Sequence, residues 1–318
     1  MARRKGNLPD EPKKPGPCGL LVLDKPTGIT SRGALDQAAK WFPRGTPLGH
    51  AGTLDPLATG ILVVCAGWAT RLVEYVQLMP KTYQTVFTFG ATSETDDSEG
   101  PITPLANCHL PAMEQIVLAL EKFQGEISQV PPAHSAARVD GKRAYRLARQ
   151  GQPVLPPAKK VFIQKIKTGS YQEGNLQLEI TCGKGTYIRS MARDLGALLG
   201  TGAFVSSLQR TRIGPFHLNM AVSPLEKPAN LQALLLPCDW ALQELPRVTL
   251  PSQLKNKFVK GTKVSLPPTF TPPLVEKEFA VNDEDGNLVA VGTFDPVENL
   301  LCPRKVLPLL PELLRNLP

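Results

Sequence analysis

Residues 49–64 read GHAGTLDPLATGILVV, a run of small residues around a single acid that ends in an apolar segment. The apolar part, bounded by glycines, predicts a buried strand or a short core helix. Asp55 stands directly before a proline, where an aspartate commonly closes a turn by bonding its own backbone. The same carboxylate is also a candidate reagent, so this stretch poses a choice between a turn residue and a catalytic one.

Length and charge narrow the class of protein. The 318 residues are enough for a sizeable core and predict two domains. The formal net charge of +8 suggests a polyanionic partner, most often nucleic acid, with a merely solvated basic surface as the alternative. No apolar run approaches the roughly 20 residues that cross a bilayer, so we expect no membrane segment. There is no oligomerisation signal, and we expect a monomer.

The cysteines and histidines predict no metal site. The six cysteines form no CxxC pair, and Cys65 and Cys182 lie in apolar, strand-like runs. This usage is typical of reduced, mostly buried thiols in a cytoplasmic protein. The four histidines lack metal-ligand spacing, and the neighbours Cys108 and His109 are too close in sequence to converge readily on one tetrahedral ion.

The two ends of the chain differ from its middle. Residues 1–16 are basic but have no apolar h-region, so we expect a disordered tail and not a secretory signal. From about residue 245, short runs separated by prolines, glycines and acidic turns predict a small all-β module that reaches residue 318. DEDGN is its expected hairpin turn.

Residues 131–169 are strongly basic, with nine lysines and arginines against one acid, Asp140. The middle, GKRAYRLARQG, predicts a helix with Arg143, Arg146 and Arg149 along one face. Like charges so close destabilise a helix unless a partner neutralises them. We therefore favour contact with an RNA backbone over a solvated helix.

The turn GKGT, which begins at Gly183, invites comparison with a phosphate-binding loop. That motif has the spacing GxxxxGK[ST], with a glycine five residues before Gly-Lys. Here Leu178 stands at that position, and no threonine directly follows Lys184. We reject a nucleotide-binding loop.

Six stretches resemble, in order, the TruB family of tRNA pseudouridine synthases. They are GLLVLDKPTGITS, GHAGTLDPLATGILVV, KTYQTVFTFG, GATSETDDSEG, VPPAHSAARVDGKRAYRLARQG and CGKGTYIRSMARDLG. The resemblance covers roughly residues 17–243, and residues 245–318 resemble more weakly a PUA-related RNA-binding module. It implies a mixed α/β (α+β) fold with a large, mainly antiparallel sheet, a cleft across the sheet and a small β-rich C-terminal domain.

The resemblance also implies a reaction. A uridine in the T loop of tRNA, conventionally position 55, would leave its stack and become pseudouridine without a cofactor. The N-glycosidic bond is cut, the base rotates, and C5 bonds to C1′. The protein would act on tRNA alone, as a cytoplasmic monomer with no obligate protein partner.

By resemblance, three residues carry the chemistry. Asp55 matches the catalytic aspartate, which either attacks C1′ or removes the C2′ proton through a glycal. Arg189 matches its ion-pair partner, with a surface arginine at a helix start as the alternative. Tyr83 matches an active-site tyrosine that stacks on the base or handles the C5 proton, with a core tyrosine as the alternative.

The remaining matches concern the substrate. His50 would hold the flipped nucleotide, with a buried or phosphate-contacting histidine as the alternative. Lys25 would support the active-site loops unless it is a solvated turn lysine. Tyr187 would line the pocket, and Leu208 would pack near the base unless it is an ordinary core leucine. Glycines in the Asp55 stretch would let the backbone approach a ribose. Residues 131–152 resemble the family's thumb, and its expected RNA contacts are Arg138, Lys142, Arg143 and Arg146.

Two other functions stay open. One is a guide-RNA-dependent, dyskerin-like pseudouridine synthase, which shares these stretches and needs protein partners. The other is an RNA-binding or tRNA-folding protein in which catalysis is secondary. Two departures from the family pattern are Ala133-His134, which puts local thumb packing in doubt, and SETDD in place of TDTDD, which keeps the polarity.

Overall fold

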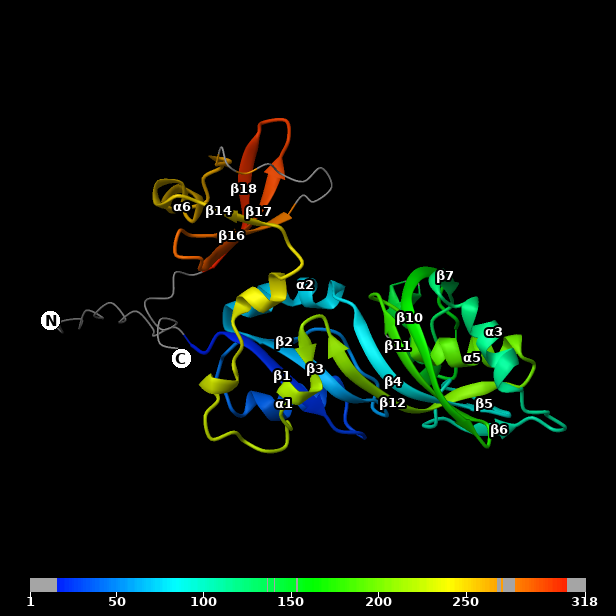
Figure 1. Cartoon of the computed structure of the whole chain (residues 1–318). Coiled ribbons are helices and arrows are strands. Elements are labelled where there is room, and N and C mark those ends of the chain that lie inside the picture. Colours follow the sequence, from blue (N-terminus) through cyan, green and yellow to red (C-terminus); the bar gives the residue numbers. More distant parts are fainter. Residues whose placement is uncertain are drawn as a thin grey trace.

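The computed structural model describes residues 16–135, 137–139, 141–152, 154–267, 270 and 278–307, without the side chains of Arg138, Arg143 and Arg149. Figure 1 shows a long twisted sheet and, beside one end of it, a second and smaller sheet. Apart from Gly16, the expected N-terminal tail lies outside the described residues. Within the described ranges, no helix combines the length and apolar character that crossing a membrane requires.

The large sheet has nine strands and is antiparallel except between β3 and β12. Its order is β1-β3-β12-β4-β11-β10-β7, with β2 on β3 and β13 on β12. The bounds are β1 (Gly19–Lys25), β2 (Leu48–His50), β3 (Thr59–Ala66), β4 (Lys81–Phe89), β7 (Gly125–Gln129), β10 (Lys159–Gln172), β11 (Asn175–Cys182), β12 (Ala203–Ile213) and β13 (Phe216–His217). This confirms the expected mixed fold with a mainly antiparallel sheet.

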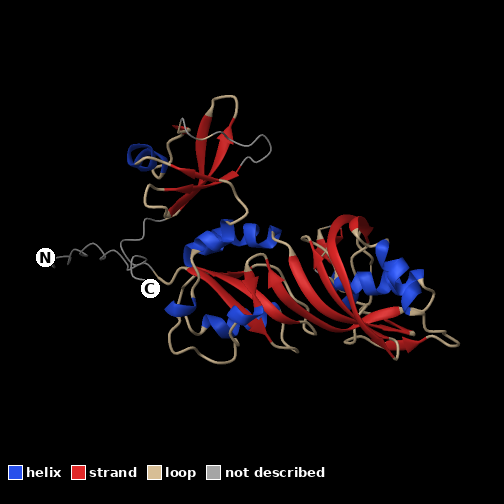
Figure 2. Ribbon diagram, in the orientation of Figure 1, coloured by secondary structure: helices blue, strands red, loops and turns tan. Residues whose placement is uncertain are grey.

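Helices cover the sheet unevenly (Figure 2). They are α1 (Ser31–Ala39), α2 (Val73–Leu78), α3 (Met113–Glu121), α4 (Ala144–Arg149), α5 (Ile188–Leu198) and the 3-10 turns η1 (Gly67–Leu72), η2 (Leu218–Met220), η3 (Gln232–Leu234) and η4 (Cys238–Leu242). At one end, α1 packs on one face of β1 and β3, while η1, α2 and η4 pack on the other. At the other end, α3 and α5 cover one face only.

The sheet is covered by helices on both faces at one end and on one face at the other, and this explains two sequence patterns. β3 is buried on both faces, so GILVVCA is continuously apolar, and the segment is a strand rather than a helix. β4 is covered on one face, so Tyr83 and Phe87 are buried while Gln84 between them is exposed. Two short hairpins, β5 (Ala91–Ser93) with β6 (Ile102–Pro104) and β8 (Arg138–Val139) with β9 (Lys142–Arg143), stand outside this sheet.

The C-terminal part forms its own five-stranded sheet, as expected. Its order is β14-β16-β17-β18-β15, built from β14 (Arg247–Thr249), β15 (Val264–Ser265), β16 (Glu278–Asn282), β17 (Leu288–Asp295) and β18 (Leu300–Val306), with α6 (Ser252–Phe258). DEDGN is the β16–β17 turn, where the Asn287 amide donates to Asp283. The indole of Trp68 in η1 donates to the Val306 carbonyl at 2.9 Å, and Glu74 pairs with Lys305. These contacts join the two sheets.

One local expectation is wrong. Arg143 belongs to β9 and not to the helix, so it does not share a helical face with Arg146. The helix α1 is capped by Thr30, whose side chain accepts a hydrogen bond from the Gly33 amide at 2.9 Å. Residues 159–167 of the basic segment 131–169 belong to the sheet strand β10.

Candidate active site

Asp55 lies in the loop between β2 and β3. Residues just before α1 and at its start hold that loop by hydrogen bonds to its backbone. The hydroxyl of Ser31 donates to the Leu54 carbonyl at 3.0 Å and accepts from the Leu54 amide at 2.7 Å. On the other side of Asp55, the Pro56 carbonyl accepts from the Gly28 amide and from Lys25 Nζ. The backbone is therefore fixed on both sides of a carboxylate whose side chain is 36% exposed.

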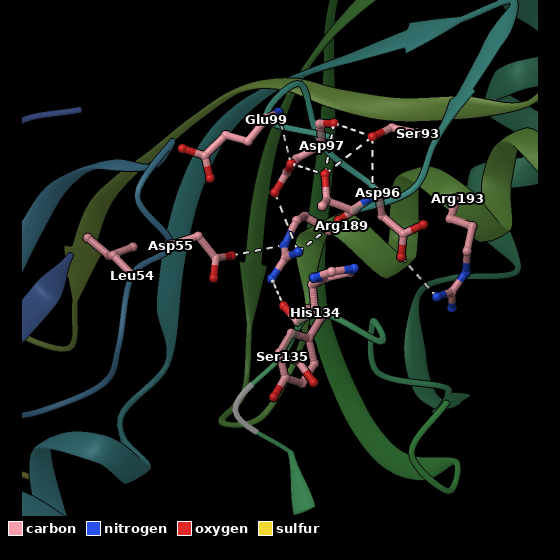
Figure 3. A network of polar contacts seen from close by, with 12 residues as sticks. Leu54, Asp55, Ser93, Asp96, Asp97, Glu99, His134, Ser135, Arg189 and Arg193 are labelled. Atoms are coloured by element: carbon pink, nitrogen blue, oxygen red, sulfur yellow. Dashed lines mark hydrogen bonds and ion pairs between the residues drawn. The ribbon is translucent and has the colours of Figure 1, made fainter. Parts of the chain in front are cut away.

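Arg189 is the buried partner of this carboxylate (Figure 3). Its Nε lies 2.9 Å from Asp55 Oδ2, and only 4% of its side chain is exposed. Nη1 donates to the Thr95 carbonyl at 2.8 Å, and Nη2 donates to the His134 carbonyl at 3.0 Å. Such a guanidinium has one fixed position, and it aims the facing carboxylate. The surface-arginine alternative is therefore wrong.

A second carboxylate lies behind Arg189. Asp97 Oδ2 is 3.4 Å from Nη1, and Asp97 is almost fully buried. Its Oδ1 accepts from the Thr95 hydroxyl and from the Glu99 amide. Arg189 is thus shared by a buried and a partly exposed carboxylate. Asp97 was expected only to keep its loop polar, and this role was missed, although the run of acids in SETDDSE was a usable signal.

The Asp55–Arg189 pair forms part of the wall of a cavity of about 530 Å³. Of the described residues that line it, Asp55 is the only carboxylate. Six cations share that lining: Lys81, Lys159, Lys160, Lys184, Arg189 and Arg210. A cavity with one acid among cations attracts a polyanion while keeping a single carboxylate for reaction.

Three predicted residues line the same cavity from different elements. Tyr83 comes from β4, Leu208 from β12, and Tyr187 from the residue before α5. Burial raises the pKa of the Tyr83 phenol, which is therefore neutral at physiological pH. The Tyr187 ring has Lys159 Nζ 4.9 Å from its centroid, and Gln129 bonds its backbone amide and carbonyl. Two rings and a leucine give the flat, apolar surfaces that a nucleobase requires.

Arg210 is a site residue that the sequence analysis missed. It is fully buried, and it stands opposite Tyr83 in the β12–β4 ladder. Nε donates to the Ile61 carbonyl at 2.8 Å, and Nη2 donates to the Gly52 carbonyl at 3.1 Å in the Asp55 loop. The positive charge of Arg210 opposes the burial that raises the pKa of the Tyr83 phenol. Arg210 therefore connects the loop, the sheet and the tyrosine.

Gly60 is a glycine because of strand packing, and not because the backbone there approaches a ribose as we expected. A Cβ there would lie 2.3 Å from the Arg210 carbonyl, and its φ is +95°. It allows β12 to approach β3 closely, and it does not line the cavity. Gly52 does line the cavity, and its φ of +92° favours glycine.

Comparison with known proteins shows the family to which this chain belongs. Residues 43–188 match the model of the TruB family pseudouridylate synthase N-terminal domain, and residues 189–243 match that of the tRNA pseudouridylate synthase B C-terminal domain. A protein of Xanthomonas campestris named tRNA pseudouridine synthase B is 37% identical over 296 residues, covering 91% of this chain and 93% of its own. One of the same name from Dehalococcoides mccartyi is 38% identical over 300 residues, covering 90% and 98%. The chain belongs to the TruB family of pseudouridine synthases.

Solved structures show the same fold. An H/ACA RNP bound to a substrate RNA containing 2′-deoxyuridine contains a chain that matches with a TM-score of 0.68 at 21% identity, covering 91% of this chain and 85% of that one. A Cbf5-Nop10-Gar1 complex gives 0.67 at 22%, covering 91% and 84%. This TruB-family chain is thus a pseudouridine synthase in sequence and in fold.

Other predicted residues of the TruB-family chain lie away from the cavity lining. His50 ends β2 and is half-buried, and among the described groups none hydrogen-bonds its buried Nδ1. Burial lowers the pKa of His50, so its imidazole is neutral. Lys142 and Arg146 are exposed on β9 and α4. The side chains of Arg138 and Arg143 lie outside the described part.

Lys25 is fully buried, so it is neither a solvated turn lysine nor a cavity residue. Nζ donates to the carbonyls of Pro26 (2.9 Å), Ile29 (2.7 Å) and Pro56 (3.1 Å). Burial lowers its pKa to about 8, which leaves the ammonium mostly protonated at neutral pH. Lys25 therefore supports the loop that carries Asp55 and does not contact the substrate space itself.

Lys25→Met is expected to lower the free energy of unfolding by about 2–4 kcal/mol, because three carbonyls lose their shared donor. The Asp55 loop loosens as well, so kcat should fall more than KM rises. Denaturant titration and steady-state kinetics measure the two effects. Lys40→Met, at an exposed lysine after α1, is the control and should change neither. Unchanged stability in Lys25→Met would contradict the loop-supporting role.

Proposed function

We propose that this enzyme isomerises the T-loop uridine of tRNA, at position 55, with Asp55 as its reagent. The observation that carries the proposal is the Asp55–Arg189 pair in a cavity whose described lining has no other carboxylate. Support for tRNA as substrate comes from the relatives' name, tRNA pseudouridine synthase B. The six cations of the lining suit the phosphates that accompany a nucleotide.

The target uridine has to leave its stack before the carboxylate reaches its sugar. Extrusion costs a few kcal/mol, which contacts to the flipped base and its phosphates offset. Tyr83 and Leu208, which line the cavity from adjacent strands, provide apolar surface for the base. A base held against them has its ribose near Asp55, and Arg189 holds that carboxylate in place.

Two routes fit a single carboxylate at this place. In one, Asp55 attacks C1′ as uracil departs, which gives a glycosyl ester that C5 of the rotated base displaces. In the other, Asp55 removes the C2′ proton and returns it after a glycal has accepted the base. Both routes end with loss of the C5 proton, and Tyr83, whose phenol lines the cavity, is a candidate to relay it.

The test uses a T stem-loop RNA and the purified protein, with no guide RNA and no other protein. Carbodiimide labelling and mass spectrometry should place one pseudouridine at position 55. An RNA with cytidine at that position is the control and should stay unmodified. Modification that appears only with guide RNA and protein partners would favour the dyskerin-like alternative. Tight binding without product would favour an RNA-folding role.

We assign residues 131–152 to an RNA-binding thumb. The β8–β9 hairpin and α4 carry the exposed cations Lys142 and Arg146. Exposed cations at a phosphate backbone release counterions, and this release makes binding depend on salt.

Lys142→Ala with Arg146→Ala is expected to weaken RNA binding and to reduce the slope of log Kd against log salt by about 1–2. Filter binding from low to moderate salt measures the slope. Lys122→Ala with Lys227→Ala, at exposed lysines outside this segment, is the matched control. An equal loss of slope in both double variants would mean that the effect is general charge and not the thumb.

A further inference from the structure

Two cysteines far apart in sequence meet next to the start of β1. Cys18 Sγ lies 3.8 Å from Cys238 Sγ, and 220 positions separate them. The segments that carry them run antiparallel. The Leu20 amide donates to the Leu236 carbonyl at 2.9 Å, and the Leu236 amide donates back at 2.8 Å. Cys18 lies two residues before Leu20, and Cys238 lies two residues after Leu236, so both cysteines are on the same side of this bridge.

The backbone geometry there suits a disulfide. Residues opposite each other in an antiparallel ladder have Cα atoms about 4.5–5.5 Å apart. That separation lies within the roughly 4.4–6.8 Å that a disulfide spans. Gly19 permits the close approach, because a Cβ on it would lie 2.7 Å from the Leu236 carbonyl. To close the bond, the 3.8 Å between the two sulfurs has to shorten to the roughly 2.0 Å of an S–S bond.

The surroundings also favour reaction at Cys18. Hydrogen bonding from the Cys238 thiol lowers the pKa of Cys18, and the backbone amides of Ala69 and Trp68 in η1 act in the same direction. The same contact raises the pKa of Cys238, so Cys18 is the better nucleophile of the pair. Both cysteines are partly exposed, whereas Cys65 and Cys182 are fully buried.

We propose that Cys18 and Cys238 form a reversible intramolecular disulfide when the enzyme meets a peroxide. The Cys18 thiolate attacks one peroxide oxygen, the O–O bond breaks, and Cys18 becomes a sulfenic acid with release of water. The Cys238 sulfur then attacks the Cys18 sulfur and expels the second water. Two thiols lose two electrons and two protons in total, and one hydrogen peroxide is reduced to two waters.

The bond would reinforce the place where the two sheets join. Cys18 contacts η1, whose Trp68 donates to the Val306 carbonyl in β18. Cys238 begins η4, the last turn before the chain enters β14. A cross-link here ties the first strand of the large sheet to the connection that leads into the small one. It lies outside the cavity lining, so the catalytic groups stay unchanged.

The experiment treats the full-length protein with hydrogen peroxide and compares it with a sample kept in dithiothreitol. Non-reducing digestion and mass spectrometry should show one Cys18–Cys238 peptide pair that has lost two hydrogens. The melting temperature should rise by roughly 5–10 °C on oxidation, because a loop of this length is closed, and should return on reduction. Cys18→Ser and Cys238→Ser should each abolish the rise.

Cys302→Ser is the matched control, since Cys302 is a partly exposed cysteine of β18 with no thiol partner among the described residues. It should keep both the peptide pair and the rise in melting temperature. A link from Cys18 to Cys65 would overturn the proposal. So would unlinked Cys18 and Cys238 at a peroxide dose that already oxidises Cys302.

Discussion

Asp55→Asn is expected to lower the single-turnover rate of pseudouridine formation by at least about 10⁴-fold, while RNA affinity stays within a few-fold of the wild type. Asparagine has nearly the same shape but carries no charge. It neither attacks C1′ nor removes the C2′ proton, so both routes stop. Binding persists because the cations of the cavity and the thumb remain. Rapid-mix kinetics with excess enzyme measure the rate, and filter binding measures the affinity.

Two further variants make the result specific. Asp55→Glu keeps the charge but moves the carboxylate by about one bond length, and a displacement of this size can cost about 100-fold in rate. Asp36→Asn removes an exposed carboxylate of α1, which pairs with Arg32 one turn earlier in the helix, and should change nothing. If Asp55→Asn turns over within ten-fold of the wild type, Asp55 is not the reagent. If affinity falls in parallel with rate, its role is recognition.

Asp55 and Arg189 stand far apart in sequence, and the resemblance to the TruB family pointed to both, whereas the Asp55 stretch alone left a turn residue as the alternative. The same resemblance led us to expect that Lys25 supports the active-site loops. The structure adds that Lys25 and Ser31 hold the Asp55 loop through the carbonyls of Pro56 and Leu54. Backbone contacts of this kind depend on the fold and leave no mark on residue type.

The burial of Arg210 could not be predicted from the sequence. An arginine in LQRTRIG looks like a charge on an exposed strand edge, because buried arginines are rare. Its burial is stabilised by the carbonyls of Ile61 and Gly52, which are 149 and 158 positions away. Only the pairing of β12 with β3 and β4 brings these groups together.

β10 was missed for a related reason. Val161 and Ile163 are buried while Phe162 between them is exposed, which is the alternation of a strand. The density of lysines led us to describe these residues only as part of the basic segment 131–169. The strand is half-covered, so its outward lysines are solvated while alternate residues enter the core. A cluster of lysines indicates a polyanionic partner, whereas the spacing of apolar residues indicates the secondary structure. In β10 both signals lie in the same residues, and only the first was used.

Arg189→Met is expected to have the second large effect, on stability as well as on rate. Methionine fills much of the same space, but the buried Asp97 then loses its ion-pair partner and retains, among the described residues, the Thr95 hydroxyl and the Glu99 amide. Breaking a buried ion pair from one side costs about 3–5 kcal/mol. The rate should fall by about 100-fold or more, because Asp55 also loses the group that aims it. Urea denaturation and single-turnover kinetics give the two numbers.

The double variant Arg189→Met with Asp97→Asn separates these two effects. With Asp97 neutral, no uncompensated charge remains inside, so most of the lost stability should return. The rate should not return, because Asp55 still has no counter-ion. Arg193→Met, one turn further along α5 at a partly exposed pair with Asp96, is the control and should cost about 1 kcal/mol or less. If the double variant is no more stable than Arg189→Met alone, Asp97 is not held by the arginine. If its rate recovers, Arg189 acts only by balancing Asp97, and Asp55 needs no partner.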